Sequence, residues 1–471
     1  MKTYNRLVIL LTVAGAFMTV NAQTTFDAVK LSEEELNGTA RYVGMGGAMG
    51  ALGNDVSAIS QNPAAIGTYH NSDINMSISF MGAQVCTDPL YTSSHPGIGG
   101  IAGNERTFYS HNTRSDLMLA FDNISAVFSG GGFADSYMNF GFSYRKIQNM
   151  DRDLDYVDSF YDADGYLVYR EFKDHQRNRI NAFDFNVSAN LSDLVYLGMT
   201  CELLTTDTWS EGYFYDYYDA GVHPDFPGGH DFTAVDKMNS ADGSGFNMSM
   251  GIIVRPVQAV RLGISLKTPT WFRQNLEYSD FLYALNNEEK DGAKYADNVD
   301  YSYSSPWTLD LSSGFTFGKT AVGVEYEQNF VKRSSLSVGN TRIDQGAVDM
   351  VDYSTLRFGV EQNISLFSLR AGYTSTSSML GNNAAPYLGD TDFNKSRLDF
   401  QTDRLGKRQN FTFGFGYCSQ PDEEGSQFYV DMAYVHGIRN SVTNIHEYIE
   451  DFDVDYKYKT NKILFTMGWN F

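Results

Sequence analysis

The last nine residues of the chain alternate between large apolar side chains and mostly smaller or polar ones. The large apolar residues occupy every odd position, as Ile463, Phe465, Met467, Trp469 and Phe471. Because successive residues of a strand point to opposite faces, this pattern predicts a strand with one apolar and one largely polar surface. Such a strand suits a transmembrane β-barrel, which turns an apolar face to lipid and a polar face to its lumen. A soluble β-sandwich is the alternative for this strand taken alone.

The same alternation recurs along most of the chain. Segments with a period of two, each bounded by turn residues, predict fourteen strands, and single-chain bacterial barrels have an even number. The predicted strands cover residues 72–83, 115–129, 138–149, 183–191, 195–206, 244–254, 259–268, 307–317, 320–330, 355–365, 367–376, 410–419, 426–437 and 461–471.

The connections between the predicted strands alternate in length. They are long after every odd-numbered strand and short after every even-numbered one, as at 192–194, 255–258 and 318–319. Outer-membrane barrels have long extracellular loops and short periplasmic turns, whereas a soluble propeller or sandwich has no reason to alternate so strictly. We therefore predict an all-β fold, a transmembrane antiparallel barrel of fourteen strands over residues 72–471.

Residues 1–22 have the features of a secretory signal peptide. Lys2 and Arg6 precede a short apolar stretch, and Val20-Asn21-Ala22 forms a small-residue cleavage site. The apolar stretch is too short to span a bilayer comfortably as a helix. Together with the strand pattern, this leader predicts export to the bacterial outer membrane.

Residues 23–71 do not have the pattern of a strand. They contain a glycine-rich run that resembles a dinucleotide-binding loop, but the third glycine of that motif would fall at Met49, and no strand precedes the run. A barrel of fourteen strands has a lumen too wide for its own side chains to fill. We expect this segment to form a plug inside the lumen, with a short capped helix at 31–36. The expected plug and gating residues are Gly44, Gly46, Gly47, Asn62, Pro63 and Ala64.

Composition and charge exclude several function classes. Aromatic residues make up 14% of the chain, as expected for a barrel with aromatic girdles. The net charge of −22 argues against nucleic acid as a partner. The histidines are scattered and no Gly-x-Ser-x-Gly elbow occurs, so we predict no enzyme, no cofactor and no catalytic residue.

Some acidic and basic residues need a separate interpretation. Asp162-Ala163-Asp164-Gly165 with Glu171 matches part of a calcium-binding loop, but without flanking helices an acidic surface turn is favoured over a metal site. Other charges fall on the expected lumen face of the strands, where we expect them to pair with one another rather than to catalyse. These are Arg145, Arg261, Glu325, Arg357, Arg370 and Asp431.

The segment Thr39-Ala40-Arg41-Tyr42-Val43-Gly44-Met45-Gly46-Gly47-Ala48 resembles the N-terminal hatch of the FadL/TodX family, as do the following Asp55-Val56-Ser57-Ala58 and Asn62-Pro63-Ala64. Members of that family are outer-membrane transporters of long-chain fatty acids and aromatic hydrocarbons. The resemblance implies a plug held by the element at 62–64 and a substrate path from the extracellular loops into the barrel. It also implies sideways release through a gap at a kinked third strand. The predicted third strand, 138–149, contains no Pro or Gly-Gly pair to mark such a kink.

Two of the long connections correspond in order to the loops that form the family's outer hydrophobic groove. They follow the fifth and seventh predicted strands, and Phe281, Leu282 and Leu285 have the spacing of a short amphipathic helix. These aromatics either capture an apolar ligand or pack the loops together and anchor them at lipid headgroups. The candidate capture residues are Tyr213, Phe214, Tyr217, Trp271, Phe272, Phe281 and Leu282.

The predicted function is therefore an outer-membrane channel for uptake of hydrophobic small molecules such as long-chain fatty acids or aromatic hydrocarbons, gated by the plug. The expected partners are the apolar ligand, outer-membrane lipid and the barrel-assembly machinery, which would recognise the C-terminal strand. The alternatives are a general porin or surface adhesin without apolar cargo and, less favoured, a barrel enzyme.

Overall fold

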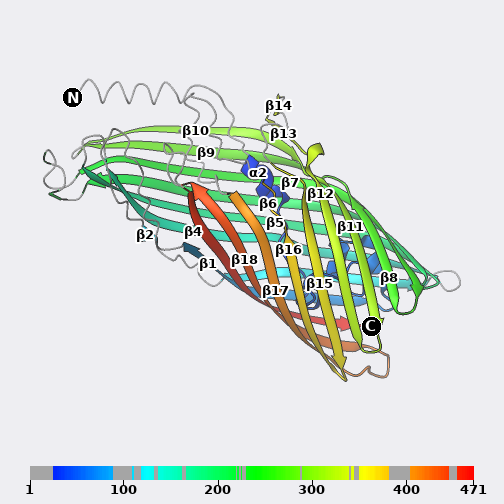
Figure 1. The fold of residues 1–471 in the computed structure, drawn as a ribbon. Helices are drawn as coiled ribbons and strands as arrows, with labels where there is room; N and C mark the ends of the chain where they lie inside the picture. The colour runs from blue at the N-terminus through cyan, green and yellow to red at the C-terminus, as the bar shows by residue number, and fades with distance from the viewer. Residues whose placement is uncertain are drawn as a thin grey trace.

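The barrel is closed by pairing between its first and last strands. The computed structural model describes residues 25–87, 109–110, 118–131, 136–161, 166–218, 220–221, 224, 230–286, 289–338, 341–343, 350–380, 404–444 and 453–471. The strands of these residues form one antiparallel sheet, in which β1 (Asp73–Thr87) pairs with both β3 (Met118–Gly131) and β19 (Asp453–Asn470). Figure 1 shows the resulting barrel with helix α2 inside it.

The described strands make up fourteen barrel strands, as predicted. Besides β1, β3 and β19, eight of the fourteen are single strands, and the short strands β2 (Tyr109–Ser110) and β14 (Thr341–Ile343) pair at the edges of the wall. The continuous strands are β4 (Ser136–Tyr161), β5 (Leu167–Leu191), β6 (Val195–Tyr218), β7 (His230–Val257), β15 (Tyr353–Ile364), β16 (Phe367–Thr376), β17 (Arg404–Cys418) and β18 (Gln427–Asn444).

The remaining barrel strands are each divided by a short break. Pro269 and Pro306 stand in two of the breaks, where a residue without an N–H cannot donate to the strand ladder. A 3-10 turn, η3 (Val331–Arg333), occupies the third. The divided strands are β8 (Val260–Lys267) with β9 (Trp271–Asn286), β10 (Glu289–Ser304) with β11 (Trp307–Phe317), and β12 (Thr320–Phe330) with β13 (Ser335–Val338).

The outer face of the barrel is apolar. On β17, Phe411, Phe413 and Phe415 are 42%, 61% and 42% exposed, while the alternating Asn410 and Thr412 are buried. The C-terminal strand follows its predicted alternation, with its large apolar side chains exposed and Leu464 buried. A soluble monomer rarely exposes such a continuous apolar surface, whereas a lipid-facing wall requires it. No helix in the described ranges is long and apolar enough to cross a membrane.

The sequence predicts long loops after the third, fifth and seventh strands, and this prediction is wrong about their conformation. They are mostly strand, because the ladders of β4 with β5, β6 with β7, and β9 with β10 continue far beyond the predicted strand ends. The amphipathic helix expected around Phe281 is likewise part of β9. These hairpins project from one end of the barrel, called here the hairpin end. The other end, with tight turns such as Ser192-Asp193, is the short-turn end.

Residues 25–72 precede β1 and lie in the lumen; they are called the luminal segment. Its elements are α2 (Thr25–Ser32), α3 (Ala40–Gly44), η1 (Val56–Ser60) and η2 (Pro63–Thr68). The helix predicted at 31–36 is wrong, because α2 ends at Ser32. The next residues bond the barrel wall instead, as Glu35 N does to the carbonyl oxygen of Ile147 at 3.0 Å.

Candidate functional site: the lumen and its N-terminal segment

Glycines in the wall allow the backbone of the luminal segment to lie directly against the strands. A Cβ atom on Gly359 would overlap the carbonyl oxygen of Met45, and one on Gly323 would overlap that of Ala48. On the segment itself, Gly46 and Gly47 have positive φ angles of 61° and 75°. Only glycine adopts these angles without strain while approaching a neighbouring backbone so closely.

The predicted plug residues lie at these wall contacts. A Cβ on Gly44 would lie 3.1 Å from the Cα of Gly414. A Cβ on Gly46 would lie 2.8 Å from the Tyr373 nitrogen, and one on Gly47 would lie 3.3 Å from Arg357 Cδ. The glycine-rich run is therefore a backbone surface packed onto strands β15 to β17.

Asn62, Pro63 and Ala64 form a second wall contact near the short-turn end. Asn62 caps η2, since its Oδ1 accepts a hydrogen bond from Ala64 N at 3.0 Å. Its Nδ2 donates to the carbonyl oxygen of Ile252 in β7 at 3.3 Å. The Pro63 carbonyl oxygen accepts from Asn186 Nδ2 in β5 at 3.2 Å. The side-chain amide of Asn62 thus joins the turn to the wall.

Buried ion pairs hold the segment to the glycine-rich side of the wall. Arg41 Nε lies 2.9 Å from Glu361 Oε2, and Arg370 Nε lies 2.6 Å from the same oxygen. Arg370 also pairs with Asp431. Removing one partner of such a buried network leaves an uncompensated charge, which strongly destabilises the folded state.

A second network centres on Arg357. Its guanidinium bonds Glu325 at 2.8 Å and Glu327 at 2.7 Å, and Glu325 Oε2 accepts from the Gly50 amide at 2.9 Å. The prediction that lumen-facing charges pair is confirmed for Arg145, Glu325, Arg357, Arg370 and Asp431. It is wrong for Arg261, which donates to the Leu52 carbonyl and lies over the Tyr196 ring at 5.8 Å.

Asp55 is a titratable group of the luminal segment itself. It is 5% exposed, and burial raises the pKa of its carboxyl above the ordinary value. Arg41, the Thr39 hydroxyl and the Ser57 amide oppose that rise. Asp55 Oδ2 accepts from Thr39 Oγ1 at 2.7 Å, and its Oδ1 accepts from Ser57 N at 2.9 Å.

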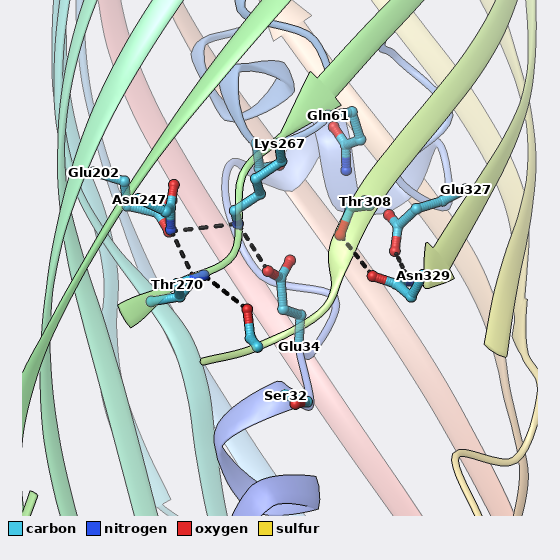
Figure 2. Close-up of polar contacts among 12 residues, drawn as sticks. Ser32, Glu34, Gln61, Glu202, Asn247, Lys267, Thr270, Thr308, Glu327 and Asn329 are labelled. Atoms are coloured by element: carbon cyan, nitrogen blue, oxygen red, sulfur yellow. Dashed lines mark hydrogen bonds and ion pairs between the residues drawn. The ribbon is translucent and has the colours of Figure 1, made fainter. Parts of the chain in front are cut away.

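A cavity of about 90 Å³ lies in the lumen, between residues 34–37 of the luminal segment and the wall strands. Lys267 projects into it and lies 3.0 Å from Glu34 and 3.4 Å from Glu202, as Figure 2 shows. Asn247 donates to Glu202 at 2.7 Å, which joins β6, β7 and β8 to the luminal segment. The ion pair between Glu34 and Lys267 links the luminal segment to the wall through side chains alone.

Asp310 on β11 is one of the unsatisfied groups that line the cavity. It is 2% exposed, and neither carboxylate oxygen has a hydrogen-bond partner within the described ranges. Its nearest cation is Arg357 Nη1 at 3.9 Å, which already bonds Glu325. The polar part of the lumen therefore retains a buried acceptor.

The hairpin end of the lumen is apolar, and α2 occupies it. Ala28 and Val29 are at most 1% exposed, and Leu31 is 6% exposed. They pack in a cluster with wall side chains that include Ile180, Leu204, Phe272, Tyr303, Tyr353 and Met379. The hydroxyl groups of Ser32 and Tyr303 hydrogen-bond at 2.7 Å, which fixes the end of the helix.

The structure separates two of the predicted capture residues. Phe272 is 2% exposed, belongs to the cluster around α2 and stacks on Tyr303 at 6.3 Å. Trp271 is 49% exposed on the outer face and stacks on Phe246 at 6.1 Å. Adjacent residues of a strand point to opposite faces, so these two cannot line one groove.

The other predicted capture residues lie on the projecting hairpins. Tyr217 stacks on Tyr169 at 5.5 Å. The register aligns Phe214 of β6 with Leu282 of β9 through one residue of β7, and Tyr213 with Phe281 in the same way. The side chains of these last four residues lie outside the described part of the chain, so their role in capture stays a prediction.

Two further predictions fall on residues that the structure does not describe. The signal peptide at 1–22 and the acidic turn at 162–165 lie outside the described ranges. Within those ranges, no group of three His, Cys, Asp or Glu side chains is arranged to hold a metal ion.

The third barrel strand, β4, is interrupted by a bulge. Ile147 is an extra residue between Lys146 and Gln148, which pair with successive residues of β5. The ladder of β3 with β4 ends at Asn123 and Arg145, although β3 extends back to Met118. Within the described residues, 118–122 of β3 therefore have no paired partner in the part of β4 that follows the bulge. The sequence gives no Pro or Gly signal for this break, because a bulge needs neither.

Comparison with solved structures identifies the architecture. A FadL homologue from Pseudomonas aeruginosa superposes with a TM-score of 0.59 at 15% identity, over 93% of this chain and 99% of that one. The fold is that of the FadL-type barrels. The toluene transporters TodX of Pseudomonas putida and TbuX of Ralstonia pickettii match this FadL-type barrel with TM-scores of 0.55 and 0.52. Their identities are 13%, and the matches cover 93% and 92% of this chain and 99% and 98% of theirs.

No protein-family model and no curated protein matches the sequence. At these identities the structural likeness establishes the FadL-type fold. Any function has to be inferred from this chain's own lumen, where the sequence did not single out Glu33, Glu34, Lys267 or Asp310. Lumen-facing charges of this kind look like ordinary surface charges in a sequence.

Proposed function

We propose that this chain is an outer-membrane channel for the uptake of hydrophobic small molecules, such as long-chain fatty acids or aromatic hydrocarbons. Residues 1–22 act as a cleaved signal peptide, 23–71 as a gating plug, and 72–471 as the transmembrane barrel with its hairpin end outside the cell. The observation that carries the proposal is the apolar cluster around α2 at the hairpin end, above a lumen filled by the luminal segment.

The proposed path enters at the hairpin end, where the α2 cluster lines the lumen with apolar side chains. It leaves sideways where the pairing of β3 with β4 stops, beside the bulge at Ile147. An apolar molecule is more stable in lipid than in water, so a sideways exit avoids an aqueous step. A general porin is the alternative, and the filled lumen weighs against it.

Deleting residues 39–64 tests the gating role. The barrel should still assemble, because the strand pairing that closes it lies outside this segment. Planar-bilayer conductance to small ions should rise well above that of the intact protein, and uptake of a labelled fatty acid should lose its gating. Conductance as low as that of the intact protein would mean that another element closes the lumen.

We also propose that the barrel-assembly machinery recognises β19. Trp469 and Phe471 are 48% and 49% exposed on the lipid face at the end of the chain. Replacing both with Lys should impair assembly, since a charge on this face costs about 2–4 kcal/mol at mid-bilayer and less near the interface. Heat-modifiable gel mobility measures the assembled fraction, with Glu423→Lys in an exposed turn as the control. Normal mobility of the double variant would refute this role of the strand.

A further inference from the structure

Three lysines lie close together on the outer face of the wall, where β17, β18 and β19 are neighbours (Figure 1). Lys407 lies in a bulge of β17 beside Asn440 of β18, and Asn440 pairs with Lys457 of β19. Lys459 faces the same way two residues further along β19, about 7 Å from Lys457 along the strand. Lys407 and Lys457 are exposed, and Lys459 is half-buried. We call Lys407, Lys457 and Lys459 the lysine patch.

The lysine patch begins where the apolar band of the wall ends. Toward the short-turn end, the same face exposes Phe413, Tyr434 and Ile463, which are aligned across the three strands. The next row is polar: Asn461 Oδ1 accepts from the Tyr434 hydroxyl at 2.8 Å and lies 2.9 Å from His436 Nδ1. Aromatic residues with polar groups mark the border between hydrocarbon and water in a membrane protein. The lysine patch therefore lies at the level of the lipid head groups, on the side of the hairpin end.

The described part of the wall supplies no counter-ion to the lysine patch. Among the outward-facing side chains that the structure describes on β1, β17, β18 and β19, none is acidic. The nearest positions in register hold Gln84, Gln409 and Ile438. The chain as a whole has 57 acidic residues against 35 lysines and arginines, so a shortage of acidic residues is not the reason.

Outward-facing cations on β5 are paired within the chain, unlike the lysine patch. Arg177 lies 3.8 Å from Asp207 of β6, and His175 lies 3.5 Å from Asp151 of β4. Like charges on neighbouring strands repel one another. Three grouped lysines without an acidic neighbour are therefore most favourable when an anion from outside the chain lies against them.

We propose that the lysine patch binds the phosphate groups of the glycolipid that forms the outer leaflet of the outer membrane. The inference rests on the proposed location of the chain, with its hairpin end outside the cell. Phosphates of this lipid lie at the level of the lysines, and its acyl chains lie along the apolar face at Phe413 and Ile463. A lipid bound here covers the pairing of β1 with β19, where Gln84 is opposite Lys459 and the barrel closes.

The test measures binding of lipid A with two phosphates to the full-length protein in detergent, by native mass spectrometry. The triple variant Lys407→Gln, Lys457→Gln and Lys459→Gln should bind about tenfold or more weakly than the intact protein, because each basic residue near an anionic lipid surface adds to the attraction. Lipid A without phosphates should bind both proteins equally. Heat-modifiable gel mobility should show a normal barrel in the variant, since the three side chains lie on the outer face.

A second triple variant is the matched control. Arg273→Gln, Lys332→Gln and Arg333→Gln also removes three exposed cations on the side of the hairpin end, with the same change in net charge. It should bind lipid A like the intact protein. An equal loss in both triple variants would mean attraction to overall charge and would overturn the patch. Equal affinities in all three proteins would overturn it too.

A fluorescent C18 polyene fatty acid, titrated into the same preparations, separates the lipid site from the proposed uptake. The lysine-patch variant should bind it like the intact protein, because the patch faces away from the lumen. Fatty-acid binding together with equal lipid A affinities would overturn the patch and leave the uptake function standing. A selective loss of lipid A in the lysine-patch variant, with no fatty-acid binding to any protein, would support the patch and overturn the uptake function.

Discussion

Ion pairs hold both ends of the luminal segment, but only one end also packs its backbone onto wall glycines. Toward the short-turn end, its backbone lies directly against wall glycines, as Met45 does against Gly359. Toward the hairpin end, α2 and residues 33–37 meet the wall mostly through apolar side chains and ion pairs such as that between Glu34 and Lys267. Close backbone packing leaves no room for adjustment, whereas ion pairs exchange partners. The first region fixes the segment in place, and under the proposed function the second is where a cargo acts on it.

Gly359→Leu should produce the largest effect, because it attacks the fixed region. Its side chain would overlap the Met45 carbonyl, and overpacking a filled site costs about 1–3 kcal/mol. We expect the segment to leave its seat and the planar-bilayer conductance to approach that of the 39–64 deletion. Gly82→Leu is the matched control, since a Cβ at Gly82 meets nothing within 4 Å. If both variants conduct like the intact protein, backbone seating is not what holds the segment.

Removing Ile147 should have an intermediate effect that falls on uptake. The deletion takes out the extra residue of the bulge, so that β4 can continue its regular pairing. It also removes the carbonyl that accepts from Glu35 N. Uptake of a labelled fatty acid should fall severalfold while heat-modifiable mobility shows a normal barrel. Ile147→Ala keeps the bulge and should retain uptake, whereas unchanged uptake in the deletion would rule out the sideways path.

The sequence predicted the lipid-facing part of the barrel well, for a physical reason. Residues such as Phe411, Phe413 and Phe415 alternate because one face of the strand meets lipid and the other meets the lumen. The pattern ended at residue 206 in β6, although the strand continues to Tyr218. Beyond the membrane a strand no longer needs an apolar face, so its residues lose the period of two. The sequence pattern therefore predicts loops where the structure has these hairpins.

The luminal contacts were predictable only in part. The glycine-rich run and Asn62 were recognised because close backbone approach and turn capping leave a local signature. The ion pairs of Glu33 with Arg408 and Arg439 left none, since the three residues are far apart in the chain and meet only in the closed barrel. The same holds for the helix expected at 31–36, where bonds to the wall overrode the local preference.

Titration of Asp55 should have the smallest effect on conductance. It tests which end of the luminal segment responds to pH. Burial raises the pKa of this carboxyl in the seated segment, so the seated state holds the proton more tightly than the released one does. The contribution of Asp55 to seating is therefore full at low pH and is lost as the pH rises through the raised pKa. Conductance of the intact protein should therefore rise from acid to neutral pH, because the ionised carboxylate disfavours the seated state. Asp55→Asn stays neutral and should give a flat profile, whereas Glu423→Gln should retain the rise. If Asp55→Asn keeps the intact protein's profile and Glu33→Gln flattens it instead, the hairpin end controls seating, and the assignment of the fixed region to the short-turn end is wrong.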